Sequence, residues 1–503
     1  MKSLKYIILL SFITLSSCEE GFFDVNEDPN NPLTSSPELT FPAAQSALAF
    51  VYGGYYNIAG EFWAQHWTQS NGAGQYRVFD NWDVTTSTLS GQYASLYNEA
   101  LNDLAYVSGE AKANGLGTFY FASEVLKVYI YQLLVDLYDQ QPYSQALKGD
   151  IGLLNPEYVS GEAIYDSLVI ALDRAYEFYQ DDVAKESMSS DLYFDGDMQA
   201  WIQFYNSLKL KIFLRQSFVP ERQSIVTQGI SELFSSNPVF LTDRSVTMTQ
   251  FGTAVNSQNP TYETEVRFMG NNNLVASENI VGFLADTENL GAEIDPRLYE
   301  YFNASKASSD YRGQKQGDNT NPSYTNDDNF SKPKLGAQDP VILMSAAEVN
   351  FLLAEVALRY PSESGLSITD AQEYYEQGIE ASFTSLGLDV AEAANLYSGG
   401  GRYEFPIDFE DQLEAIITQK WVSFVNTQGM EAYIEFKRTG YPKAQWDYSS
   451  DYILTTPVNN VTGGRPIKRL QFSDDEISRN PNVPAVIEPT VPVWWDVRDA
   501  VSN

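Results

Sequence analysis

The stretch TFYFASEVLKVYIYQLLVDLY, residues 118–138, constrains the fold more than any other part of the chain. It contains neither glycine nor proline, and its only charged residues are Glu124, Lys127 and Asp136. This pattern is typical of a helix that is apolar nearly all round, which is stable only where neighbouring elements enclose it. Pro142 follows and is expected to stop the helix. The chain is therefore predicted to build layers of helices around this segment.

Further stretches show the three- and four-residue spacing of amphipathic helices. They are residues 89–111, 161–180, 195–217, 345–360, 369–387 and 409–442. Asp197 is placed to cap the third of them, and the last is expected to break near Gly429. The fourth and fifth follow each other after a short polar break. They form a helix-turn-helix pair of the kind found in tetratricopeptide arrays, without the strict consensus of that repeat.

Two regions lack this periodicity. Residues 236–344 are rich in Asn, Gly, Ser, Thr and Tyr, and the chain from Lys443 onward has the same character. Such a composition predicts irregular or short-stranded surface structure. The expected architecture is a mostly α protein with little β structure: a single helical body, residues 41–503, carries a loop-rich insertion at about 236–344 and an irregular C-terminal segment at about 443–503. Rigid helices would position these loops, and loops often carry ligand contacts.

The N-terminus has the pattern of an export signal. Lys2 and Lys5 precede the apolar run YIILLSFITL, which has the charge and length of a secretory signal and is too short to span a bilayer. The residues LSSC then end at Cys18, the only cysteine. They resemble the lipobox of bacterial lipoproteins, in which the peptide is cut before the cysteine and acyl chains such as palmitate are attached. Residues 1–17 are thus predicted to be a signal peptide and Cys18 the lipid attachment site, with a free buried cysteine as the alternative.

The residues after Cys18, EEGFFDVNEDPNNPLTSSP, are dense in Asp, Asn, Pro and Ser and cannot continue a helix. Residues 18–40 are therefore expected to form a lipid-anchored tether. The formal net charge of the chain is −36. This charge excludes nucleic acid as a partner, because the protein would repel its phosphates.

Residue types that catalyse reactions or bind metals are scarce. The chain has one histidine, His66, so a two-histidine metal motif is excluded, and a lipidated cysteine leaves no Cys/His pair. His66 lies between Trp63 and Trp67, where a packed histidine is the simpler interpretation. No catalytic residue, metal site or cofactor is predicted. A surface hydrolase with paired carboxylates stays an alternative, because sequence spacing cannot show which of the 67 acidic residues face each other.

Several local strings together resemble the SusD/RagB family of nutrient-binding outer-membrane lipoproteins of the Bacteroidetes. They are DVNEDPNNP, YQLLVDLYDQQPYSQAL, DGDMQAWIQFYNSLKLKIFLR, DPRLYEYF, ILMSAAEVNFLLAEVA, ITQKWVSFVNTQGMEAYIEFKRTGYP and RPIKRLQFSDDEISRN. The resemblance implies a tetratricopeptide-like helical superhelix without enzymatic activity. It also implies an outward-facing protein, lipid-anchored to the cell outer membrane, that captures a glycan or another oligomeric nutrient. Such a protein acts as the lid of a SusC-type TonB-dependent transporter; a peptide-binding lid is the alternative.

The charged residues in these strings also have a simple physical interpretation. Glu348 and Glu355 are expected to be solvated or paired helix carboxylates, and Lys437 and Arg438 to face the carbonyl groups at a helix end. These strings therefore describe a scaffold and name no ligand.

A sugar presents flat C–H faces and a rim of hydroxyl groups, so its site needs aromatic rings together with amide or charged groups. The loop NGAGQYRVFDNWDVTTST offers Tyr76, Arg77 and Trp82, and the loop YETEVRFMGNNN offers Arg267 and Asn272. These five residues are the predicted ligand contacts. For each ring, the alternative is that it pins its loop to the core.

Overall fold

The computed structural model describes residues 35–183, 185–286, 293–324, 327–445 and 453–498. The predicted signal peptide, Cys18 and most of the tether lie outside these residues. Helix α2 (Pro37–Val51) begins within the expected tether, so the helical body starts at Pro37 and not at residue 41. The reason is local, because a proline in the first turn of a helix loses no hydrogen bond.

Helix α7 (Gly117–Tyr138) lies at the centre of the first group of helices, as its apolar sequence predicts. Nearly all of its side chains are buried. The helices packed against it are α2, α6 (Asn102–Asn114), α8 (Gly161–Asp181) and α9 (Met198–Arg215).

A second group of helices forms the tetratricopeptide-like part of the molecule. Helices α14 (Ala346–Arg359) and α16 (Ile368–Ser385) pack side by side, and α18 (Phe409–Ser423) packs against both. After a break that ends at Gly429, α19 (Gly429–Thr439) turns back into the body. The expected mostly α, tetratricopeptide-like architecture is confirmed.

Shorter helices connect these groups. They are α3 (Asn57–Trp63), α4 (Arg77–Asp80), α5 (Ser90–Ser95), α10 (Gln223–Ser235), α11 (Pro260–Tyr262), α12 (Glu278–Leu284), α13 (Arg297–Tyr301), α15 (Pro361–Ser364), α17 (Val390–Tyr397) and α20 (Asp474–Arg479), with π-helical segments η1 (Tyr52–Tyr56), η2 (Leu96–Leu101) and η5 (Glu263–Phe268). Among the described helices, none has both the length and the apolarity needed to cross a bilayer.

The β structure of the described residues consists of short two-stranded pieces, most of which involve the insertion. Strand β1 (Trp67–Gln69) pairs antiparallel with β5 (Leu274–Ala276), and β4 (Val246–Met248) pairs with β8 (Val341–Met344). The remaining pairs are β2 (Gln141–Pro142) with β3 (Tyr158–Val159), β6 (Phe302–Asn303) with β7 (Lys332–Pro333), and β9 (Ala444–Gln445) with β10 (Leu454–Thr455).

Local polar groups set the starts of the helices. The Asp197 carboxylate accepts hydrogen bonds from the backbone N–H groups of Gln199 and Ala200, so this residue caps α9 as predicted. Ser345 caps α14 in the same way, because its hydroxyl accepts from the N–H of Glu348 at 3.1 Å.

Two glycines let α3 and α19 touch backbone to backbone. A Cβ atom on Gly60 would lie 1.9 Å from the backbone nitrogen of Met430, and one on Gly429 would lie 2.4 Å from the backbone nitrogen of Glu61. No other residue type fits at either position without moving a helix. This contact joins the start of α19 to the segment that leads into β1.

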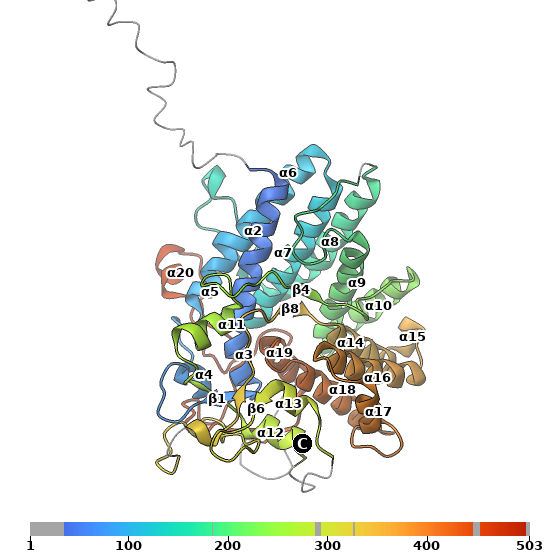
Figure 1. The fold of residues 1–503 in the computed structure, drawn as a ribbon. Helices are drawn as coiled ribbons and strands as arrows, with labels where there is room; N and C mark the ends of the chain where they lie inside the picture. Colours follow the sequence, from blue (N-terminus) through green and yellow to red (C-terminus); the bar gives the residue numbers. More distant parts are fainter. Residues whose placement is uncertain (1–34, 184, 287–292, 325–326, 446–452, 499–503) are drawn as a thin grey trace, which may run out of the picture.

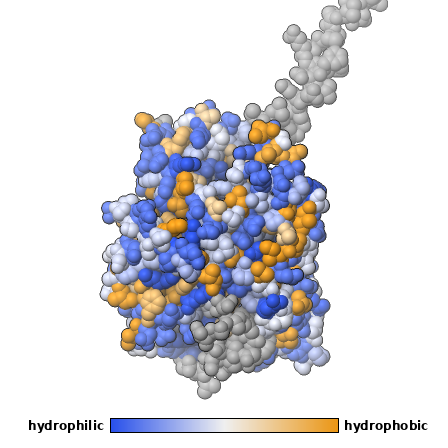
Figure 2. All heavy atoms as spheres, turned by 180° about the vertical axis from the view of Figure 1, so that it is seen from behind, coloured by the Kyte–Doolittle hydropathy of each residue, from blue (hydrophilic) through white to orange (hydrophobic). Residues whose placement is uncertain are grey.

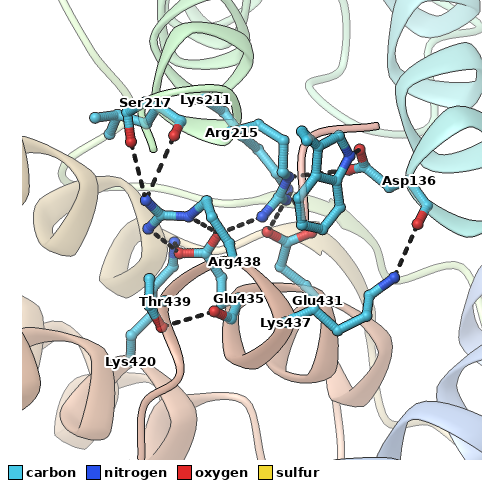
Figure 3. A network of polar contacts seen from close by, with 12 residues as sticks. Asp136, Lys211, Arg215, Ser217, Lys420, Glu431, Glu435, Lys437, Arg438 and Thr439 are labelled. Carbon is cyan, nitrogen blue, oxygen red and sulfur yellow. Dashed lines mark hydrogen bonds and ion pairs between the residues drawn. The ribbon is translucent and has the colours of Figure 1, made fainter. Parts of the chain in front are cut away.

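A network of buried ion pairs ties the two helical groups together (Figure 3). Arg215 on α9 is 0 % exposed in its side chain and donates to Asp136 on α7 at 3.0 Å. It also donates to Glu431 on α19 at 2.6 Å and to Glu435, one turn further along the same helix. One guanidinium group therefore links three helices.

Glu435 lies at the centre of this network. It accepts from Arg438 on its own helix at 2.6 Å and from Lys420 on α18 at 3.0 Å, while Arg438 also bonds Glu355 on α14 at 2.6 Å. Burial by itself raises the pKa of the Glu435 carboxyl, but the surrounding cations Arg438, Lys420 and Arg215 together hold that pKa well below its ordinary value.

The pairing expected for the two α14 glutamates is confirmed: Glu355 bonds Arg438, and Glu348 pairs with Lys211 at 2.8 Å. Arg438 is 1 % exposed and belongs to the ion network; it also donates to the backbone oxygen of Leu214 at the end of α9 at 3.4 Å, so the carbonyl it faces is not on its own helix. Lys437 does donate to a helix-end carbonyl at 2.9 Å, but to that of Asp136 on α7 and not on its own helix.

The two ends of the molecule differ. Ser35, the first described residue, makes hydrogen bonds with the hydroxyl of Tyr106 on α6. This is the end of the molecule where α2 begins and α6 ends (Figure 1). The loops around α4 and β1 gather at the opposite end. Hydrophilic residues cover much of the face shown in Figure 2, and hydrophobic residues form several separate clusters on it.

We predict that the substitution Glu435→Gln lowers the free energy of unfolding by about 3–5 kcal/mol, since removing one partner of a buried ion pair leaves the other charges uncompensated. Urea denaturation followed by circular dichroism measures this change. Asp475→Asn is the control: it removes an exposed ion pair with Arg479 and should cost about 1 kcal/mol or less. Equal effects of the two substitutions would contradict the role assigned to the network.

Candidate functional site

Four distant segments meet at the end of the molecule opposite Ser35 (Figure 1). We call this surface the loop face and define it as residues 69–83, 268–273, 316–324 and 457–461. Backbone hydrogen bonds join the segments: Ser70 N–H donates to Asn273 O at 2.8 Å, and Val461 N–H donates to Asn81 O at 2.9 Å. The pairing of β1 with β5 brings the first two segments together.

Asp80 is the buried centre of the loop face. It is 1 % exposed and accepts hydrogen bonds from the Thr68 hydroxyl at 2.9 Å, the Gln316 amide at 3.1 Å and the Asn319 amide at 2.7 Å. Burial raises the pKa of the Asp80 carboxyl to about 7, although the hydrogen bonds from Asn319 and Thr68 act in the opposite direction. One carboxylate thus holds two loops that are far apart in sequence.

Side-chain amides surround this centre. Asn319 donates to Asn81 at 2.8 Å and accepts from Asn459 at 3.2 Å. Asn321 donates to Asp318 at 2.7 Å. Asn81, Asn319 and Asn459 thus form a connected set of neutral amide groups, with Asn319, which is 1 % exposed, as its buried centre. Asn81, Asn459 and Asn321 are half-buried, and their amide groups can both donate to and accept from the hydroxyl groups of a ligand.

Another asparagine extends this set toward an aromatic pair. Asn71 donates to the backbone oxygen of Tyr324 at 2.9 Å. The half-buried rings of Tyr324 and Phe330 meet edge to face, with their centroids 4.9 Å apart. Aromatic rings beside amide groups provide the two kinds of contact that a sugar requires.

A groove of about 330 Å³ lies next to the second predicted loop. Its rings are Phe50, Tyr55 and Phe268, and the Phe268 side chain is 67 % exposed. Gln92 and Glu99 contribute polar groups to the same groove. This groove also combines ring faces with hydrogen-bonding groups; Arg267, the residue before Phe268, is exposed but does not line it.

The structure brings the two predicted loops together, because the Tyr76 hydroxyl reaches the sulfur of Met269 at 3.5 Å. However, Tyr76 and Trp82 are buried, at 0 % and 2 % exposure. Tyr76 packs against Phe62, with ring centroids 5.6 Å apart. This corrects the role expected for both rings: in this conformation neither offers a face for stacking, and both pin their loop to the core.

The other three predicted contacts lie nearer to the surface. Arg77 is half-buried, while Arg267 and Asn272 are exposed. The Arg77 Nε atom is buried and has no hydrogen-bond partner among the described residues. These three residues stay predictions as ligand contacts.

His66 is buried and paired, so it is not available as a catalytic base. Its Nδ1 atom lies 2.7 Å from the Glu61 carboxylate, both side chains are 0 % exposed, and its ring packs against Trp421 with centroids 5.0 Å apart. Burial raises the pKa of Glu61, and His66 opposes this. The histidine therefore belongs to the packed contact between β1 and α18.

Sequence reasoning missed the buried Asn319, which links segments of the loop face, and the half-buried residues Asn71, Asn321, Tyr324 and Asn459. For Asn319, Asn321 and Tyr324 the signal is the composition of the segment GDNTNPSYTNDDNF, which is dense in asparagine and carries two rings. Composition indicated a loop there, but only the tertiary contacts bring this segment to the first loop.

A protein family described as SusD-like, starch-binding and associating with the outer membrane matches residues 29–455. The chain belongs to the SusD-like family. The resemblance inferred from the sequence motifs is therefore confirmed. No curated protein matches the chain significantly.

Solved structures of other SusD homologues have the same fold. A chitin-binding homologue from Flavobacterium johnsoniae is 21% identical, with a TM-score of 0.74, covering 92% of this chain and 98% of its own. A homologue from Bacteroides uniformis is 23% identical, with a TM-score of 0.72 and coverage of 91% and 99%. One from Bacteroides thetaiotaomicron is 20% identical, with a TM-score of 0.71 and coverage of 93% and 100%. At these identities the likeness shows the fold alone.

We predict that the loop face is held more firmly in mild acid than in mild base. The folded-state pKa of Asp80 lies above its ordinary value of 3.8, so the stability it contributes is fully present below pH 3.8 and is lost as the pH rises through about 7. Hydrogen exchange of residues 67–82, corrected for intrinsic rates, should show greater protection at pH 5.5 than at pH 8. The difference should shrink in Asp80→Asn; an unchanged difference would assign the effect to other groups.

Proposed function

We propose that this SusD-like protein captures a glycan on its loop face and takes no part in breaking it down. The observation that carries the proposal is the group of half-buried amides of Asn71, Asn81, Asn321 and Asn459, which lie around the buried Asn319 and beside the rings of Tyr324 and Phe330. The rings would stack on the C–H face of a sugar, and the amides would bond its hydroxyl groups. Support for the ligand class comes from the starch-binding description of the family and from the chitin-binding relative.

A noncatalytic role fits the state of the buried carboxylates on the loop face. Asp80 accepts three side-chain hydrogen bonds, and Asp318 accepts one from Asn321. A glycosidase needs one carboxylic acid poised to protonate the leaving oxygen and a second carboxylate that faces the sugar. Asp80 is engaged in holding the loops and is 1 % exposed.

We also propose that Cys18 carries the lipid anchor, that residues 1–17 are removed, and that the protein faces outward from the outer membrane. Residues 18–34 would connect the anchor to Ser35, and the loop face lies at the other end of the molecule from Ser35. Tethering at one end leaves the binding loops free to meet a nutrient outside the cell. A SusC-type TonB-dependent transporter would then receive the glycan when this protein closes over it as a lid.

Tyr324→Ala should weaken the binding of starch- or chitin-derived oligosaccharides by about 1–2 kcal/mol, because it removes a stacking surface. Isothermal titration calorimetry with purified protein measures the change. Phe409→Ala on α18 is the control, since it removes a ring that is 48% exposed but lies outside the loop face. Unchanged affinity in a folded Tyr324→Ala variant would exclude this ring from the site.

The lid role predicts a stable complex in the membrane. Mild-detergent extraction of the native outer membrane, followed by affinity purification of this protein and mass spectrometry, should recover a TonB-dependent barrel. The matched control is Cys18→Ala, which should lose membrane attachment. Recovery of the free lipoprotein alone would contradict the lid mechanism while leaving glycan binding intact.

A further inference from the structure

A cavity of about 580 Å³ opens between the tetratricopeptide-like helices and the insertion. We call it the junction cavity. Its inner wall includes Gly53, Asn57, Thr261, Val341 and Val425, and its outer rim includes Asn303 and Ser385. The volume lies in the range of roughly 300–1,000 Å³ that small-ligand pockets occupy, and such pockets often lie where two structural units meet.

The junction cavity is separate from the loop face and from the groove at Phe268. The π-helical segment η1 forms the wall between the cavity and the groove: Gly53 lines the junction cavity, and the next residue, Gly54, lines the groove. A Cβ atom on Gly53 would lie 2.4 Å from a methyl carbon of Val341, so the wall requires glycine there. π-Helical segments of this kind occur frequently at functional sites.

The lining is nearly neutral and combines polar with apolar residues. Four asparagines, four serines and two threonines line the cavity, against one lysine and two acidic residues. Lys334 lies 3.5 Å from Glu300, and the Asp339 carboxylate accepts from the N–H of Gly336 at 2.6 Å. The few charges therefore already have partners within the wall, and a charged ligand would gain little there.

The inner polar groups are held in place before any ligand arrives. Asn426 accepts from Trp67 Nε1 at 2.9 Å and donates to Tyr301 O at 2.8 Å, and Asn57 accepts from the N–H of Gly429 at 3.0 Å. Preorganised polar walls lower the entropic cost of binding. These contacts also fix the cavity to the α3–α19 junction.

Other groups keep hydrogen-bonding capacity for a ligand. The hydroxyls of Ser423 and Thr427 donate to backbone carbonyls, which leaves lone pairs on their oxygens as acceptors. The exposed amide of Asn303 at the rim can both donate and accept. Apolar groups, among them the aliphatic side chains of Leu335, Val341, Ile342 and Val425, supply the larger part of the cavity surface. Hydroxyl groups on a compact C–H framework match this mixture of donors, acceptors and aliphatic contacts.

We propose that the junction cavity is a second binding site, which takes a neutral polyhydroxylated molecule of monosaccharide or disaccharide size. It differs from the loop face in shape and chemistry. The loop face is an open surface with aromatic rings, whereas the only aromatic residue that lines the cavity within the described part of the chain is Tyr301, which is 3 % exposed. The cavity therefore suits a short sugar held by hydrogen bonds at its edges, not a long chain stacked on rings.

The test is calorimetric titration of the purified protein with glucose, maltose, N-acetylglucosamine and chitobiose. We expect at least one of them to bind the wild type and Tyr324→Ala equally well. Ala381→Phe, which fills the cavity from α16, should weaken that binding at least tenfold. Thr384→Phe is the matched control, because Thr384 is exposed on the same helix and does not line the cavity; it should bind as the wild type does.

Three results would overturn the proposal: no binding of any of the four sugars, binding that Ala381→Phe leaves intact, or a short neutral peptide that competes for the cavity more strongly than the sugars. If Ala381→Phe does not fold, Ser385→Trp at the rim replaces it. Loss of oligosaccharide binding in Tyr324→Ala with retained monosaccharide or disaccharide binding would separate the two sites. If the loop face bound no glycan, the binding of a short sugar in the junction cavity would be unaffected.

Discussion

The buried ion network around Glu435 is the constraint on which the rest of the structure depends. It joins α7, α9, α14, α18 and α19, which come from distant parts of the chain, and nearly all of its side chains are removed from water. A buried charge without a partner costs several kcal/mol. If any one of these helices packed differently, at least one buried charge would lose its partner. The network therefore disfavours other arrangements of the two helical groups.

This scaffold determines where the binding loops lie. The glycine contact between Gly60 and Gly429 attaches α3 to α19. From there the chain passes through the buried His66 into β1, which pairs with β5, and Asp80 then holds the loops of residues 69–83 and 316–324. A continuous set of buried contacts thus runs from the ion network to the loop face. Loops positioned by rigid elements in this way can present a defined arrangement of polar groups to a ligand.

The region of the candidate site was predictable from the sequence, but its individual contacts were not. Both loops chosen for their rings and amides do lie together. Tyr76 and Trp82 nevertheless face inward, because a ring in a loop gains more from packing against a neighbour such as Phe62 than from exposure. A ring that packs inward and a ring that stacks on a ligand have the same sequence pattern. The asparagines of the loop face come from segments far apart in the chain, so no local pattern could group them.

The sequence by itself determined the long amphipathic and central helices, the cap of α9 and the family, because helical periodicity and capping depend on residues within a few positions of one another. The tertiary structure alone decided which polar groups are buried. Helix α19 carries Glu431, Glu435, Lys437 and Arg438, a composition typical of an exposed helix, yet all of its residues are buried. Their partners lie on helices distant in sequence, and the burial of a charge depends on those partners and not on its neighbours in the chain.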